Sequence, residues 1–407
     1  MSEKLPAMRR DLEFISVEHG GQQLVLIRDP LGLVPEGRAI PIGVYNLMTL
    51  LDGTTTLVDL QTLLMRQGGG VLVESDTVRR LVSQLEEIFL LDSERFRHAR
   101  SEIASGFAKK PVRPCSHSGR AYPADPHELR ARLDEILSCH GPAAGREAQV
   151  RALVSPHIDL AVGRKGYGSA YHTLKGASPS KVVLLGIGHQ MLQGMFSLTE
   201  KDFETPLGMV RSERPWVRRL KDSLPEMVAV DDFAHRAEHS IEFQVLFLQH
   251  VLSENSFTIV PILCGSLLTC LPDYRRQAYL ETAQPFLETL RELLRGGGED
   301  ILLVAGVDLS HIGLKFGHTL PASGLEAEAQ AHDRRLLESL CRLDPDPFWE
   351  ESARVKDGYN VCGFSALACL LEVLPTHKEG NLLHYEIWHE QATRSAVSFA
   401  AVAFHAR

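Results

Sequence analysis

The sequence lacks a long apolar run and has few cysteines. None of its 407 residues belongs to a stretch approaching 18 consecutive apolar residues, and residues 1–6 lack the apolar segment of a secretory signal. We therefore expect a cytoplasmic protein that makes no contact with a membrane. The seven cysteines are odd in number and irregularly spaced, which argues against a disulfide framework and for reduced thiols.

Long basic tracts are also missing. Basic residues occur as isolated pairs, such as Arg218–Arg219, and the formal net charge is −9, so the chain offers no electrostatic footprint for nucleic acid. What it has in quantity is apolar side chains, 44% of residues against 23% charged ones. This composition is typical of a globular protein, and the length allows two or three domains.

The first part of the chain predicts a small helical domain. Residues 23–27 look like a strand and residues 44–51 like a short helix, and Thr56 opens a second helix with Asp59 as its capping-box partner. A third helix begins at Ser75, because the residues that follow it place one apolar stripe at helical spacing: Val78, Leu81, Val82, Leu85, Ile88 and Phe89.

We interpret residues 1–105 as a winged-helix-like accessory domain and residues 106–114, with two prolines and two lysines, as a linker. The turn at residues 50–54 and the stripe after it resemble the small peptide-binding domains of the PqqD type, which implies a peptide partner. The alternative is a packed domain without a ligand, since winged helices serve many roles. The lack of a basic face argues against DNA binding.

From Cys115 onward, strands alternate with helical stretches, which predicts an α/β domain over residues 115–407. Four short apolar runs are typical of buried parallel strands, and open α/β sheets place their ligand sites at the carboxyl ends of such strands. The sequence therefore predicts one polar pocket that holds a metal, since the four runs lead to polar residues: 152–155 to His157, 182–185 to His189, 301–304 to Asp308 and His311, and 259–263 to Cys264.

Each candidate has a plainer alternative when taken singly. His157 precedes a glycine-rich stretch, and His189 follows Gly186 and Gly188, which let the chain turn sharply; a histidine that merely packs in a turn fits both patterns. The Gly-x-Gly sequence is not a dinucleotide fingerprint, because its third glycine is missing.

His239 and Glu242 lie one turn apart at the start of a predicted helix, where they can bind metal or share a proton. Alternatively, Glu238 and Glu242 only favour the positive end of the helix dipole, and His239 is solvated.

Asp308 and His311 follow the strongest strand signal and can form an acid–base pair. The alternative is that Asp308 caps the next helix. Cys362 precedes the apolar stretch 366–374, where a nearby helix N-terminus would lower its pKa and make it a soft metal ligand. Buried cysteines are otherwise inert, and we interpret Cys264 as core.

Six short motifs follow one another along the chain: Cys115-Ser116-His117-Ser118-Gly119-Arg120-Ala121-Tyr122-Pro123, Pro156-His157-Ile158-Asp159, Gly186-Ile187-Gly188-His189, Glu238-His239-Ser240-Ile241-Glu242, Asp308-Leu309-Ser310-His311 and Cys362-Gly363. Their order resembles that of the Memo family, whose bacterial members are called AmmeMemoRadiSam system protein B. The resemblance covers about residues 115 to 405.

This resemblance implies a central, mostly parallel sheet flanked by helices, similar to class III extradiol dioxygenases, with a mononuclear iron or copper site. The implied metal ligands are His157, His189 and Cys362. The residues implied to line the same pocket, in catalytic roles, are Asp308, His311, His239 and Glu242. Two departures from the family pattern, Gln190 in place of a second histidine and Gly188 in place of serine, bear on the groups that orient His189.

Two imidazoles and a thiolate suit Fe(II) or copper and leave positions open for substrate or dioxygen. The leading hypothesis is a metal-dependent redox enzyme that acts beside a radical-SAM protein and other components of the AmmeMemoRadiSam system, as the family name implies. Ring cleavage of a catechol is a variant, although a thiolate in place of the usual carboxylate ligand argues against it. The alternative is a non-catalytic adaptor that binds metal or peptide.

Overall fold

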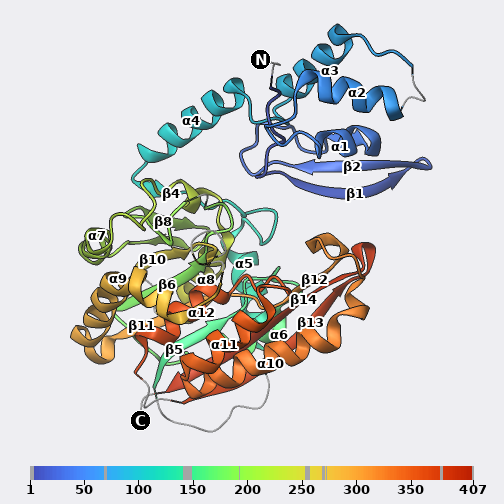
Figure 1. Ribbon diagram of the computed structural model, residues 1–407. Helices are drawn as coiled ribbons and strands as arrows, with labels where there is room; N and C mark the ends of the chain where they lie inside the picture. The colour runs from blue at the N-terminus through green and yellow to red at the C-terminus, as the bar shows by residue number, and fades with distance from the viewer. Residues whose placement is uncertain are drawn as a thin grey trace. The chain divides into compact units, whose positions relative to one another are not determined.

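The structure is a computed structural model that describes residues 4–67, 71–140, 149–191, 193–252, 257–267, 271, 273–375 and 379–405. The chain divides into two compact units, Met1–Lys109 and Lys110–Arg407 (Figure 1). The segment expected as a linker, 106–114, includes the end of helix α4 (Glu94–Ala108) and the short strand β4 (Val112–Arg113).

The first unit combines a small antiparallel sheet with four helices. Its strands are β1 (Glu13–His19), β2 (Gln22–Arg28) and β3 (Ala39–Pro41), and its helices are α1 (Ile42–Met48), α2 (Leu57–Gln67), α3 (Ser75–Glu87) and α4. The strand over residues 23–27 and the three predicted helices are present, whereas β1, β3 and α4 were not predicted. The capping box forms, because the Asp59 amide lies 3.2 Å from Thr56 Oγ1 and the Thr56 amide 3.0 Å from Asp59 Oδ2. The winged-helix and PqqD likenesses stay predictions.

The second unit is built on an eight-stranded sheet in which β12-β14-β5-β11-β6-β10-β7 are neighbours and β13 pairs with β14 (Figure 1). Its central strands β5 (Val150–Ser155), β11 (Ile301–Gly306), β6 (Lys181–Ile187) and β10 (Thr258–Cys264) are parallel, as the four apolar runs predict. The strands that run antiparallel to their neighbours were not predicted: β7 (Phe196–Leu198), β12 (His311–Gly313), β13 (Gly380–Glu390) and β14 (Ser395–His405).

Helices cover both faces of this sheet. Along β6, Val183 and Leu185 pack into one apolar cluster and Val182 and Leu184 into another, because neighbouring residues of a strand point to opposite faces. The first cluster includes α7 (Arg214–Ser223), α9 (Arg276–Gly296), α10 (Glu326–Arg342), α11 (Pro345–Val355) and α12 (Phe364–Val373); the second includes α5 (Pro126–Leu137), α6 (Arg164–His172) and α8 (His239–Val251). The central, mostly parallel sheet flanked by helices is therefore confirmed.

A third, three-stranded sheet joins β4 to β8 (Asp202–Thr205) and β9 (Gly208–Val210). In the part of the chain that the structure describes, no helix combines the length and the apolar character needed to span a membrane.

Candidate metal centre

The carboxyl ends of three parallel strands and the start of α12 bring the predicted site residues together. His157 follows β5, His189 follows β6, and Asp308 follows β11, which pairs with both of those strands. Cys362 lies just before α12. Parallel strands end at one edge of a sheet, so residues far apart in sequence converge there.

His157, His189 and Cys362 form a compact group whose possible ligand atoms all lie within 4.8 Å of one another. The Cys362 Sγ atom is 3.5 Å from His157 Nε2, and the two imidazole ring centroids are 5.1 Å apart. His157 is buried, whereas Cys362 is partly exposed, and the His189 side chain is 35% exposed. The group is therefore partly accessible to solvent.

Both histidines of this group use one ring nitrogen for a hydrogen bond to an acceptor. His157 Nδ1 lies 2.9 Å from the Gly306 carbonyl, and His189 Nδ1 lies 3.0 Å from Glu238 Oε1. Since a carbonyl or carboxylate oxygen only accepts, each Nδ1 donates, which leaves Nε2 with a lone pair when the ring is neutral. Metal-binding histidines are oriented in this way, so these residues fit a metal ion.

Glu238 is a site residue that the sequence reading assigned only to the helix dipole. Its buried carboxylate accepts from the Ser240 amide at the start of α8, and it lies 3.3 Å from His239 Nδ1. Burial opposes its ionisation most strongly, but the charge and hydrogen bond of His189, the charge of His239 and the Ser240 amide together outweigh burial and hold the pKa of Glu238 well below its ordinary value. His189, Glu238 and His239 make a second group of residues that could hold a metal ion. The signal in the sequence that could have identified Glu238 as a site residue was its position as the N-cap of α8, directly before His239.

Asp308 and His311 lie at the same centre. Asp308 Oδ1 accepts from the His157 amide at 3.0 Å, and Oδ2 lies 3.5 Å from His157 Nε2. His311 Nδ1 lies 2.9 Å from the Leu309 carbonyl. Burial raises the pKa of Asp308 to about 6 and lowers that of His311 to about 4. The alternative in which Asp308 caps a helix is wrong, because strand β12 follows it.

His239 and Glu242 are separated by their partners, contrary to the expectation that they act together. The His239 ring lies 5.0 Å from that of His189 and 5.1 Å from that of His157. Glu242 instead forms a buried ion pair with Arg113. It also accepts from the His117 amide at 2.9 Å, and Tyr122 and Ser116 complete its partners. Glu242 thus anchors residues 113–122 to α8 at one side of the centre.

The Cys362 thiol differs from expectation in its acidity. Burial raises the pKa of this thiol, although hydrogen bonding to His189 acts in the opposite direction. The helix N-terminus was expected to lower this pKa, whereas burial acts to raise it. A bound cation would deprotonate the thiol outright.

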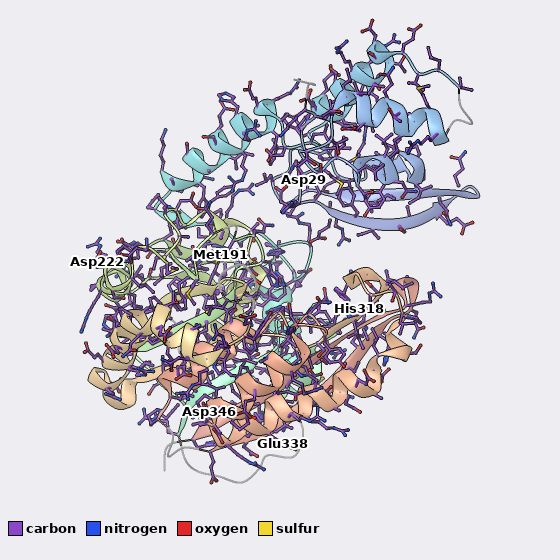
Figure 2. All side chains as sticks on the ribbon, viewed as in Figure 1. Asp29, Met191, Asp222, His318, Glu338 and Asp346 are labelled. Atoms are coloured by element: carbon purple, nitrogen blue, oxygen red, sulfur yellow. The ribbon has the colours of Figure 1, made fainter. Side chains whose placement is uncertain are left out.

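Gly188, which stands where the family pattern has serine, has a local explanation. A β-carbon at this position would meet Met191 Sδ at 2.2 Å, so the Met191 side chain occupies the space that a serine needs. Met191 is labelled in Figure 2. The turn that carries His189 is therefore packed by a thioether in place of a serine hydroxyl.

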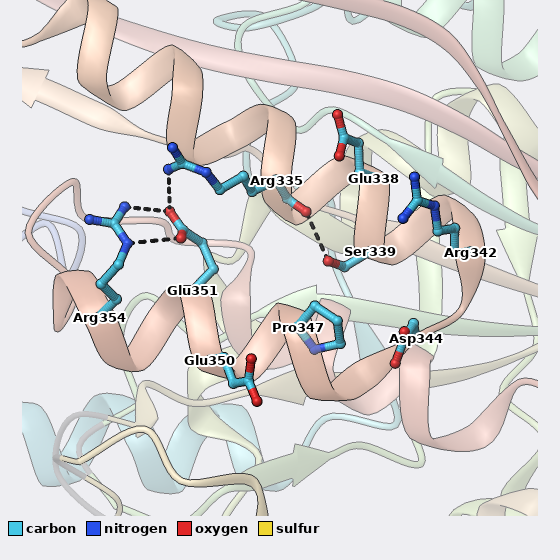
Figure 3. Close-up of a pocket in the computed structure, with 9 residues that line it drawn as sticks. All are labelled: Arg335, Glu338, Ser339, Arg342, Asp344, Pro347, Glu350, Glu351 and Arg354. Atoms are coloured by element: carbon cyan, nitrogen blue, oxygen red, sulfur yellow. Dashed lines mark hydrogen bonds and ion pairs between the residues drawn. The ribbon is translucent and has the colours of Figure 1, made fainter.

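A pocket between α10 and α11 contains none of these residues (Figure 3). Its buried Glu351 already accepts from Arg335 at 3.1 Å and from Arg354 at 2.7 Å. Because this carboxylate is neutralised by its own neighbours, we regard the pocket as a solvated surface feature.

The fold and the site thus define an α/β protein with a histidine–histidine–cysteine group at the carboxyl edge of a parallel sheet. Comparison with known sequences agrees: the sequence profile described as Memo-like protein matches residues 113–403. The chain belongs to the Memo family.

Curated relatives match most of the chain. A MEMO1 family protein of Aquifex aeolicus is 29% identical over 98% of this chain and 100% of its own length, and one of Thermus thermophilus is 31% identical over 81% and 93%. The memo-1 homolog of Caenorhabditis elegans is 25% identical over 73% and 83%. Among solved structures, an uncharacterized protein of Escherichia coli K12 aligns with a TM-score of 0.35 at 15% identity, over 62% of this chain and 99% of that one, a likeness too low to support an argument.

Proposed function

We propose that this protein binds one iron or copper ion through His157, His189 and Cys362 and uses it in an oxidation–reduction reaction. The observation that carries the proposal is the orientation of the two imidazoles. Each commits Nδ1 to an acceptor while its Nε2 is left for the cluster that contains Cys362 Sγ. Two imidazoles and a thiolate form a borderline-soft donor set that suits Fe(II) and copper.

The surrounding residues support a chemical role for the centre. A bound ion would supply one-electron chemistry and positions for substrate. Glu238 and the Gly306 carbonyl orient the two imidazoles. Asp308 and His311 lie beside them and can hold or move a proton at a substrate atom. His239 stacks on His189 and lies beside the same centre.

The reaction class and the partner follow from the family resemblance. The proposed enzyme acts with a radical-SAM protein on a modified peptide or protein, and the proposed likeness of its fold to class III extradiol dioxygenases supports oxygen-dependent chemistry. Cleavage of a catechol ring is the weaker variant, because a thiolate replaces the carboxylate ligand of those enzymes. The other candidate is a non-catalytic adaptor, favoured by the separate N-terminal unit, which would bind a peptide.

Metal analysis of protein purified without oxygen tests the proposal. The wild type should contain about one iron or copper per chain, whereas His189→Ala should retain little, because a three-ligand site loses one donor. His98→Ala, at an exposed histidine of α4 in the first unit, is the matched control and should keep its metal. If His189→Ala binds iron and copper as tightly as the wild type, the ligand set is wrong.

A second measurement separates an enzyme from an adaptor. The Fe(II)-loaded enzyme should consume dioxygen in the presence of a candidate substrate. An adaptor should instead bind peptide through residues 1–109 whether or not metal is present.

A further inference from the structure

Asp333 is a buried carboxylate on α10 that lies outside the metal centre. It is fully shielded from solvent, and hydroxyl groups from three other segments donate to it. The distances to its carboxylate oxygens are 2.7 Å from Ser310 Oγ, 2.6 Å from Ser398 Oγ and 2.8 Å from Tyr385 OH. These three hydroxyls are hydrogen-bond donors to the charged carboxylate and offset part of its desolvation.

One of these donors belongs to the segment 308–311 of the candidate centre. Its backbone is held by Ser398 on β14: the Leu309 amide donates to the Ser398 carbonyl at 2.8 Å, and the Ser310 amide donates to Ser398 Oγ at 2.9 Å. Ser398 Oγ in turn donates to Asp333. Asp333 therefore holds both the side chain of Ser310 and the residue that pairs with its backbone.

The same short segment touches the residues of the proposed metal site on its other side. Asp308 Oδ1 accepts from the His157 amide, and the Asp308 carbonyl accepts from the Gly363 amide at 3.0 Å. Cys362 Sγ lies 3.5 Å from that carbonyl. A shift of residues 308–311 would therefore move the surroundings of both His157 and Cys362.

We propose that Asp333 is a positioning residue, which acts through Ser310 and Ser398 to fix Asp308 and His311 at the metal centre. This inference rests on the proposed function. An apolar side chain could fill the same space on α10, but it would not fix the orientation of Ser310 and Ser398. Hydrogen bonds to the Asp333 carboxylate do fix it, because their strength depends on angle. Sequence spacing separates Asp333 from Ser310 by 23 residues and from Ser398 by 65, so the link exists only in the folded chain.

The test compares hydroxyl deletions on the two sides of Asp333. Ser310→Ala removes the link to segment 308–311, and Tyr385→Phe removes a hydroxyl bond of similar length from the same carboxylate without touching that segment. Co(II) is the probe, because its visible spectrum reports ligand geometry. Ser310→Ala and Asp333→Ala should change the spectrum and weaken Co(II) binding about tenfold, as loss of an outer hydrogen-bond partner does. Tyr385→Phe should leave both unchanged.

Further measurements keep the result interpretable. Asp333→Asn keeps one acceptor oxygen and should restore part of the wild-type spectrum. If all four variants lower the unfolding temperature but keep the wild-type spectrum and affinity, Asp333 is purely structural and the inference is overturned.

Failure of the proposed function would look different. In that case the wild type itself would bind no Co(II), Fe(II) or Cu(II). Hydrogen exchange of the metal-free protein then decides the inference: amides of residues 308–311 should exchange faster in Ser310→Ala and at the wild-type rate in Tyr385→Phe. Equal exchange in the two variants would overturn the positioning role independently of any metal.

Discussion

Among the described residues, each of the two units contains an ion pair whose two side chains are fully buried, and the surroundings of the two pairs differ. In the first unit, Arg9 Nη2 lies 2.7 Å from Asp29 Oδ1, and Arg9 also donates to the Phe89 carbonyl. Asp29 accepts from the Leu31 and Val34 amides. All these partners belong to the first unit, which the pair therefore stabilises.

In the second unit, the buried pair Arg113–Glu242 adjoins the candidate metal centre. Arg113 donates to the Glu238 carbonyl at 2.8 Å, and Glu242 accepts from the His117 amide. Both groups of potential metal ligands in the described residues lie in this unit. A buried charge is therefore no mark of function by itself; what marks this centre is a pair of imidazoles whose Nδ1 atoms are each held by an acceptor, in one group with the Cys362 sulfur.

The strongest test of this difference between the units is to express the second unit without the first. A fragment of residues 110–407 should fold and bind metal, because Lys201 Nζ donates to the Lys110 carbonyl and β4 pairs with β8. A matched fragment that begins at Pro114 lacks Arg113 and should fail to fold or lose its metal. Solubility and metal content of the two fragments are the measurements. Equal behaviour would show that Arg113 is dispensable.

Single substitutions make the same comparison in the whole chain. Arg113→Ala and Arg9→Ala should each destabilise their own unit by about 3–5 kcal/mol, because each leaves a buried carboxylate without its partner. Only Arg113→Ala should also weaken metal binding. Denaturant unfolding and metal titration of both variants check this, and weakened binding in Arg9→Ala would contradict the separation of roles.

Glu238→Gln tests the orientation of His189. The amide can still accept from His189 Nδ1, but it loses the charge that favours this contact, so metal affinity should fall about 10-fold to 100-fold. Glu87→Gln, at an exposed glutamate of α3 in the first unit, is a control that should not change affinity. An unchanged affinity for Glu238→Gln would remove Glu238 from the site.

The smallest effect on metal binding is expected for Asp308→Asn. Its amide oxygen can still accept from the His157 amide, so the metal should stay bound. Because the amide cannot take up a proton, the rate or pH dependence of a reaction should change instead. Loss of the metal in this variant, or a structure with Asp308 on the metal in place of Cys362, would show that Asp308 is a ligand.

The comparison with relatives bears on how general the two-unit arrangement is. The family profile begins at residue 113, within the second unit. The alignment with the Aquifex aeolicus protein nevertheless covers 98% of this chain, so it includes most of the first unit as well. The first unit is thus shared with at least one relative, and its role stays a prediction.

Local pattern alone was enough for several parts of this protein. Short apolar runs ending in polar residues predicted the four parallel strands, because a strand buried on both faces has a continuous apolar sequence. The Thr56–Asp59 capping box was equally readable, since both partners lie within one turn. The order of the motifs brought His157, His189 and Cys362 together as candidates, and the fold places them side by side.

Only the tertiary structure decided which charged residues lie beside His157, His189 and Cys362. Glu242 lies 129 residues from Arg113, and Asp333 lies 65 residues from Ser398, so no local period links either pair. The sequence pattern predicted that Glu242 and His239 share one helix face and act together. In the structure, Glu242 forms an ion pair with Arg113, and Glu238 is the partner of His189. A periodic pattern records which side of an element is buried; which buried groups then meet depends on how the strands are ordered in the sheet.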